Sequence, residues 1–169
     1  MARAPLSLKA RAIGLLAQRE HSRAELRRKL LRIAREQLLK AAEAGAPAET
    51  VETPDAEACA EQVDALLDRL AAEGYLSEQR FVESRLHQRA QRFGLQRIRQ
   101  ELAQHGLSLD EEQQTQLRDS ELARAREVRQ RRFGDALPTE AGEQAKQMRF
   151  LMARGFSGDT ARKALRQPE

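Results

Sequence analysis

The stretch LMARGFS, residues 151–157, indicates how this 169-residue chain folds, because it combines the end of one helix with the start of the next. Leu151 lies one turn before the end of an amphipathic run, and Gly155 can adopt the left-handed conformation that terminates a helix. Phe156 is apolar and can pack back onto the last turn, while Ser157 has a side chain preferred at a helix N-cap. The stretch therefore predicts a tight corner between two helices.

The same corner recurs along the chain. Residues 70–77 and 102–108 repeat the leucine, glycine, apolar residue and serine, and residues 16–22 form a degenerate copy with Glu20 in place of glycine. Repeated corners favour tandem helical units that bury their faces against neighbours. Ala, Leu, Arg, Glu and Gln dominate the composition and favour helices throughout. We predict an all-α fold of about nine helices, arranged as tandem three-helix repeats with an elongated or curved shape.

The periodicity divides the chain into three predicted repeats, at residues 1–75, 76–117 and 118–169. The first contains an acidic, Ala- and Pro-containing segment at about 41–55, where the helical pattern is lost and an insertion is predicted. Ser22 with Glu25, and Ser108 with Glu111, have capping-box spacing and predict two helix starts. The Gln-rich stretch that follows is weakly patterned, and the next clear helix is expected over about 118–132.

The last long helix is expected to open at Pro138 and Thr139. Its apolar residues at helical spacing predict the inward face of that helix. These residues are Ala141, Ala145, Met148 and Met152.

Several classes of protein are excluded by residue usage. Cys59 is the single cysteine, so no disulfide framework can form, and a reducing, cytoplasmic location is expected. No apolar run is long enough to span a membrane, and the N-terminus does not resemble a signal peptide. One cysteine and three scattered histidines cannot form a metal site, and no phosphate-binding loop is present. We therefore expect no enzyme, no catalytic residue, no metal and no cofactor.

Charge is distributed in blocks of alternating sign. Residues 1–40 carry a net charge of +8, residues 41–78 of −9, residues 79–107 of +4, residues 108–121 of −4 and residues 122–134 of +4. Such blocks are consistent with polar faces that bind a charged partner. They are equally consistent with solvated helix faces and with pairing between blocks inside the molecule.

Arginine is the most distinctive residue type in the second half of the chain. Arg85, Arg89 and Arg92 recur at helical spacing and share one face. Arginine is preferred where carboxylates or phosphates are gripped through two parallel hydrogen bonds, and few aromatic residues are available for a dedicated single-strand binder. The predicted partner-binding basic face comprises Arg85, Arg89, Arg92, Arg97, Arg99, Arg129, Arg131 and Arg132.

Three segments, in order, resemble a known family. They are RFVESR at 80–85 followed by GLQRIRQEL at 94–102, RFLMARGFS at 149–157, and the N-terminal stretch 10–31 with SRAEL at 22–26. Together they resemble the RecX regulators of the RecA recombinase. The resemblance implies three tandem three-helix repeats that bind the groove of the RecA–DNA filament and inhibit ATP hydrolysis and strand exchange by RecA. It also implies a role in recombination and DNA repair, with the filament and possible DNA backbone contacts as partners.

Two alternatives remain open. A direct DNA-binding module would place base-reading side chains at the start of the helix after a corner. The residues there, Glu78-Gln79, Leu109-Asp110 and Gly158-Asp159, are acidic or small, which counts against it. A helical scaffold for another protein would have no effect on RecA. Nothing in the sequence demands more than a monomer.

Overall fold

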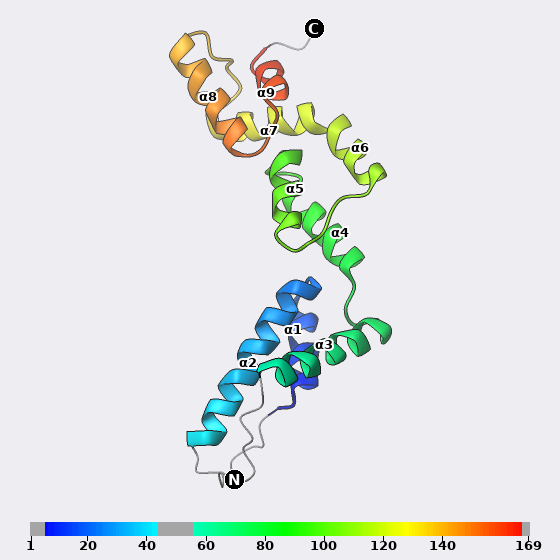
Figure 1. Cartoon of the computed structure of the whole chain (residues 1–169). Helices are drawn as coiled ribbons and strands as arrows, with labels where there is room; N and C mark the ends of the chain where they lie inside the picture. The colour runs from blue at the N-terminus through cyan, green and yellow to red at the C-terminus, as the bar shows by residue number, and fades with distance from the viewer. Residues whose placement is uncertain (1–5, 44–55, 167–169) are drawn as a thin grey trace. The chain divides into compact units, whose positions relative to one another are not determined.

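The computed structural model describes residues 6–43 and 56–166, and these residues form nine helices and no strand (Figure 1). The all-α fold class is confirmed. The predicted insertion at 41–55 lies, from residue 44 onward, outside the described residues. The helices are α1 Leu8–Gln18, α2 Arg23–Glu43, α3 Ala56–Ala72, α4 Glu78–Arg89, α5 Leu95–Ala103, α6 Glu111–Asp119, α7 Glu121–Phe133, α8 Ala141–Ala153 and α9 Gly158–Ala164.

The glycine corners form as predicted. Gly74, Gly106 and Gly155 have positive φ angles of 78°, 73° and 83° and follow the ends of α3, α5 and α8. After Gly155, the Phe156 N–H donates to the Leu151 carbonyl at 3.2 Å, which satisfies an orphan carbonyl of the last turn. Each corner therefore ends one helix and sets the direction of the next.

Two corners differ from the predicted pattern by small shifts. After α3 the residue that packs back is Leu76, which is buried, while Tyr75 is 47% exposed. Before α6 the N-cap is Asp110, whose carboxylate accepts from the Gln113 N–H at 2.7 Å. The predicted start at Ser108 is thus wrong by two residues.

The Gln-rich stretch forms α6, so the helix start predicted from the capping-box spacing is followed by a helix although the apolar pattern there is weak. Its capping box is complete, since the Gln113 side chain accepts from the Asp110 N–H at 3.1 Å. Leu117 is its one buried residue. A good cap and a single apolar anchor therefore support a helix whose other positions are polar.

The chain divides into two compact units, Met1–Phe81 and Val82–Glu169. In unit 1, α1 and α3 both pack on α2 around a leucine-rich core (Figure 1). Arg27 on α2 binds Asp64 on α3 through two hydrogen bonds of 2.7 and 2.9 Å, and Arg23 pairs with Asp68 at 2.7 Å. Internal pairing therefore accounts for part of the opposed charge blocks at 1–40 and 41–78.

In unit 2, α8 and α9 pack on α7 (Figure 1). Their shared core comprises Ala125, Val128, Leu151, Phe156, Ala161 and Ala164. The predicted inward stripe of α8 is wrong for Ala141, Ala145 and Met152, which are exposed. The buried positions on that helix are Gln147 and Leu151.

Candidate partner-binding face

All eight predicted arginines lie in unit 2. Arg85 and Arg89 belong to α4, Arg92 to the following turn, Arg97 and Arg99 to α5, and the other three to α7. Unit 2 has 17 Lys and Arg against 13 Asp and Glu, whereas unit 1 has 13 of each. The net charge of +4 on the chain therefore belongs to unit 2.

Three guanidinium groups surround one half-buried ring, that of Phe93 in the turn between α4 and α5. The guanidinium carbons of Arg89, Arg97 and Arg154 lie 5.3, 5.7 and 5.8 Å from the Phe93 ring centroid. Cations are attracted to the negative face of an aromatic ring at such distances. We call Phe93, Arg89, Arg97 and Arg154 the Phe93 cluster. It concentrates positive charge from two segments about 60 residues apart in sequence.

The aromatic contacts continue from the Phe93 cluster onto α8. The Arg154 guanidinium also lies 4.6 Å from the Phe150 ring centroid. Phe150 and Phe133 meet edge to face, with centroids 5.1 Å apart. A continuous series of cationic and aromatic side chains therefore connects the α4–α5 turn with the end of α7.

Glu101 joins two arginines of the Phe93 cluster. Its Oε2 lies 3.1 Å from the Arg89 Nε and its Oε1 lies 3.3 Å from the Arg97 Nε, so one carboxylate connects α4 and α5. These groups border an open hollow of about 320 Å³. The α4–α5 hollow is lined by Arg85, Arg89, Arg97, Gln100, Glu101, Gln104 and His105.

Two turns approach each other closely and so position the Phe93 cluster. The Gly94 N–H donates to the Arg154 carbonyl at 2.9 Å, and the Gln96 N–H donates to the Gly155 carbonyl at 3.2 Å. A Cβ atom on Gly94 would lie 2.2 Å from the Gly155 oxygen. Only glycine fits there, because no real Cβ contact is that short. This contact brings Arg154 to Phe93.

Two buried or half-buried side chains of α7 fix the same turn. The Glu121 carboxylate accepts from the Leu95 N–H at 3.0 Å, at an α5 N-terminus where Gly94 offers no side-chain cap. The Arg124 guanidinium donates to the Ala90 and Phe93 carbonyls at 2.8 and 2.7 Å. An anion at a helix start and a cation at a helix end both complement the helix dipole. The turn that carries Phe93 is therefore held from α7.

Arg129 has a structural role, which corrects its predicted place on an exposed face. Its side chain is buried, with 5% exposure. The guanidinium donates to the carbonyls of Gly134, Asp135 and Ala136 at 3.1, 3.1 and 3.0 Å. These bonds fold the segment after α7 onto the helix. Arg129 is not available to a partner.

Four other predicted arginines are exposed and lie outside the Phe93 cluster, namely Arg92, Arg99, Arg131 and Arg132. Arg131 pairs with Glu127 of its own helix at 3.1 Å, and Arg99 donates to Gln114 of α6. Arg92 and Arg132 are exposed. Among residues 6–43 and 56–166, no hydrogen bond or ion pair joins Arg131 or Arg132 to the Phe93 cluster, whereas Arg124 of the same helix donates to the Phe93 carbonyl. Of the predicted set, Arg85, Arg89 and Arg97 line one hollow.

The sequence prediction missed Arg154 and Glu101. Arg154 lies in the corner directly before Gly155, and its contact with Phe93 depends on packing between distant segments. Glu101 follows Arg97 by four residues, a spacing that does signal an ion pair on one helix face. That spacing could have identified Glu101 before the structure was known.

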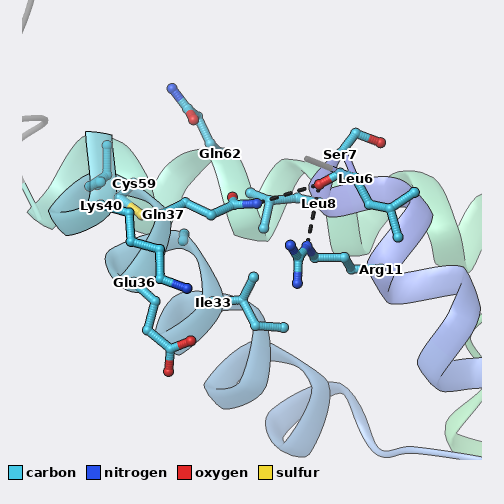
Figure 2. A pocket seen from close by; sticks show the side chains of 12 residues that line it. Leu6, Ser7, Leu8, Arg11, Ile33, Glu36, Gln37, Lys40, Cys59 and Gln62 are labelled. Carbon is cyan, nitrogen blue, oxygen red and sulfur yellow. Dashed lines mark hydrogen bonds between the residues drawn. The ribbon is translucent and has the colours of Figure 1, made fainter. Parts of the chain in front are cut away.

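A larger hollow lies in unit 1, where α1, α2 and α3 meet (Figure 2). It measures about 800 Å³, and Leu6, Leu8 and Ile33 contribute apolar walls. The Leu6 carbonyl accepts from the Arg11 Nε at 3.3 Å and from the Gln37 amide at 3.4 Å (Figure 2). Its walls contain no convergent set of acid, base and nucleophile. We assign it no chemistry.

The part of the chain that the structure describes also lacks a metal-ligating cluster and a membrane-spanning helix. There, no group of three or more His, Cys, Asp or Glu side chains is placed to hold a metal ion. None of the described helices combines the length and the apolar character needed to cross a membrane.

Comparisons with known proteins agree on one family. Residues 77–111 match the second three-helix domain of RecX, and residues 119–165 match the third. The "Regulatory protein RecX" of Leptothrix cholodnii is 49% identical over 166 residues, covering 97% of this chain and 90% of the relative. That of Ralstonia nicotianae is 48% identical, covering 92% and 84%, and that of Herminiimonas arsenicoxydans is 43% identical, covering 100% and 97%.

Proposed function

Because the chain belongs to the RecX family of regulatory proteins, we propose that it is a non-catalytic regulator of RecA. It binds the RecA–single-stranded DNA filament and inhibits ATP hydrolysis and strand exchange by RecA. In this way it modulates homologous recombination, DNA repair and the SOS response. It acts in the cytoplasm, as a monomer.

The Phe93 cluster is the observation that carries this proposal. It presents three guanidinium groups at a turn held rigidly by Gly94, Glu121 and Arg124. Pre-organised arginines lose little entropy on binding and form paired hydrogen bonds with oxyanions. A filament offers both protein carboxylates and DNA phosphates. The proposed face comprises Arg85, Arg89, Arg92, Arg97, Arg99, Arg131 and Arg132, with Arg154 in place of Arg129.

The division into three repeats at 1–75, 76–117 and 118–169 belongs to the same proposal. The matched ranges 77–111 and 119–165 fall within the second and third repeats and support it. On this division the Phe93 cluster combines residues of both.

Direct DNA binding is a second candidate function, and one observation favours it. Half-buried Phe93 and Phe150 have the Arg154 guanidinium between them. Alternating aromatic and cationic side chains are typical of surfaces on which single-stranded bases stack.

The test is ATP hydrolysis by RecA on single-stranded DNA, titrated with this protein, beside a binding titration on the same DNA without RecA. Inhibition at concentrations well below those that bind naked DNA supports filament regulation. Naked-DNA binding with a steep salt dependence, and inhibition only through competition for DNA, supports the second candidate. No effect in either titration supports a scaffold for some other protein.

A further inference from the structure

We propose that the α4–α5 hollow is a carboxylate-binding site, in which Glu101 occupies the place that an Asp or Glu side chain of a partner protein takes on binding. The inference rests on the proposed function, because it names the chemistry by which the basic face recognises the protein part of its target.

The geometry of the hollow is that of an occupied oxyanion site. Each oxygen of Glu101 contacts a different guanidinium, at 3.1 Å for Arg89 and 3.3 Å for Arg97. Both guanidiniums are also held against the ring of Phe93. The contacts with the ring help to hold the two guanidinium groups near each other. An incoming carboxylate finds the two cations already spaced for its two oxygens.

The internal carboxylate is easily displaced. The side chains of Glu101, Arg89 and Arg97 are 21%, 35% and 49% exposed, and ion pairs this accessible to water contribute little to stability. Both ion pairs use the Nε atoms, and among the described residues no hydrogen bond engages the Nη groups of Arg89 or Arg97. Exchange of one carboxylate for another therefore costs little.

The rest of the lining suits an anion. Besides Glu101, the walls consist of arginines, His105 and the amides of Gln100 and Gln104, which can donate hydrogen bonds. Glu101 itself is the single acidic group. Once Glu101 turns outward, the lining that remains consists of side chains that can donate hydrogen bonds.

A carboxylate fits this site better than a nucleic-acid phosphate. The internal occupant is itself a carboxylate with one oxygen on each arginine. A nucleic-acid strand carries a negative charge at every nucleotide, so several phosphates would remain close to the displaced Glu101. An isolated acidic side chain avoids that repulsion.

The test is the variant Glu101→Gln, titrated with a hexaglutamate peptide while the side-chain Nε–Hε resonances of Arg89 and Arg97 are followed by NMR. Loss of the internal competitor should tighten peptide binding about 1.4- to five-fold, because an exposed ion pair contributes roughly 0.2–1 kcal/mol. Glu143→Gln is the matched control, since it removes the same charge from another exposed ion pair of unit 2, whose partner Lys146 lies outside the proposed face. The control should leave peptide binding unchanged.

Several outcomes would overturn the inference. If Glu101→Gln binds the peptide no more tightly than Glu143→Gln does, Glu101 serves only as a structural link between α4 and α5. Equal or greater tightening toward inorganic phosphate or an oligothymidine would assign the site to phosphates. In the parent protein, Arg97→Gln should abolish the peptide-induced shift of the Arg89 resonance, which tests the site even if Glu101→Gln does not fold. None of these titrations contains RecA. The proposed regulation of RecA can therefore be refuted while the carboxylate site is supported, and the carboxylate site can be refuted while the regulation of RecA is supported.

Discussion

The substitution Gly94→Ala tests whether the contact between the α4–α5 turn and the α8–α9 turn organises unit 2. The added methyl group would lie 2.2 Å from the Gly155 oxygen and 2.4 Å from the Phe156 nitrogen, both of which are backbone atoms. Backbone cannot swing aside as a flexible side chain can. The two turns must therefore separate.

The expected cost follows from what the separation removes. Two inter-turn hydrogen bonds are lost, those of the Gly94 and Gln96 N–H groups, at about 1 kcal/mol each. The contact of Arg154 with Phe93 is weakened, at about 0.5–1 kcal/mol. Residual overpacking adds about 1 kcal/mol. The unfolding free energy of unit 2 should fall by about 3.5 to 4 kcal/mol.

Urea unfolding of the full chain, followed by circular dichroism, measures this loss. Gly142→Ala is the matched control, because Gly142 lies in the first turn of α8 with nothing within 4 Å of an added Cβ. It should stabilise the chain by up to about 0.5–1 kcal/mol through helix propensity. The reasoning is refuted if Gly94→Ala unfolds at the same urea concentration as the parent protein or as Gly142→Ala.

Three further predictions concern buried or paired groups. Arg129→Lys should destabilise unit 2 by roughly 2–4 kcal/mol in the same urea assay, because an ammonium cannot reach three carbonyls and leaves buried acceptors unpaired. The control is Arg132→Ala at an exposed position, which should cost no more than about 0.5 kcal/mol. An equally small loss for Arg129→Lys would contradict the structural role of Arg129. For Glu25, partial burial raises the pKa, but the hydrogen bonds and charges of neighbouring cations outweigh it and lower the pKa from 4.5 to about 2. The stabilisation from Glu25 is therefore present above pH 4.5 and is lost as the pH falls toward 2. Glu25→Gln should flatten the fall of stability at acid pH, and an unchanged fall would count against this assignment. For His21, burial lowers the pKa from 6.5, so the imidazole is protonated at a lower pH in the folded state than in the unfolded chain. The stability of the fold therefore falls as the pH drops below 6.5. His21→Leu should remove this dependence on pH, and if the dependence persists it belongs to other groups.

Local signals in the sequence were sufficient for the corners. A leucine, a glycine that accepts a positive φ angle, and a capping serine lie within seven residues of one another, so their meaning does not depend on distant packing. Gly155 and Ser157 behave as this pattern predicts, and Ser157 accepts from the Thr160 N–H at 3.0 Å.

The inward face of α8 could not be read from apolar spacing, because a buried polar pair decides it. The corner places Leu151 inside, and the residue one turn earlier on that face is Gln147. Gln147 is buried and lies 3.4 Å from the Arg129 guanidinium, to which its side-chain oxygen is hydrogen bonded. The alanines at 141 and 145 consequently face outward.

The prediction of the basic face from the sequence was also limited, because tertiary contacts decide which arginines are buried and which are exposed. Composition identified an arginine-rich region, but it could not separate Arg129, which binds backbone carbonyls, from Arg89 and Arg97, which surround Phe93. Arg154 joins that cluster through the contact between two glycines, Gly94 and Gly155. Such contacts between distant segments depend on tertiary packing and produce no periodic pattern in the sequence.

The most direct test of the account is RecA ATP hydrolysis on single-stranded DNA, titrated with the triple variant Arg89→Gln, Arg97→Gln and Arg154→Gln. A control variant removes three exposed cations of unit 2 outside the proposed face, by Arg118→Gln, Arg162→Gln and Lys163→Gln. With the helical content of both variants unchanged, the triple variant should need roughly ten-fold more protein for half-inhibition, because arginines at the centre of an interface dominate its energy. The control should inhibit like the parent protein. Equal inhibition by the triple variant and the parent protein would contradict the claim that the Phe93 cluster binds the filament.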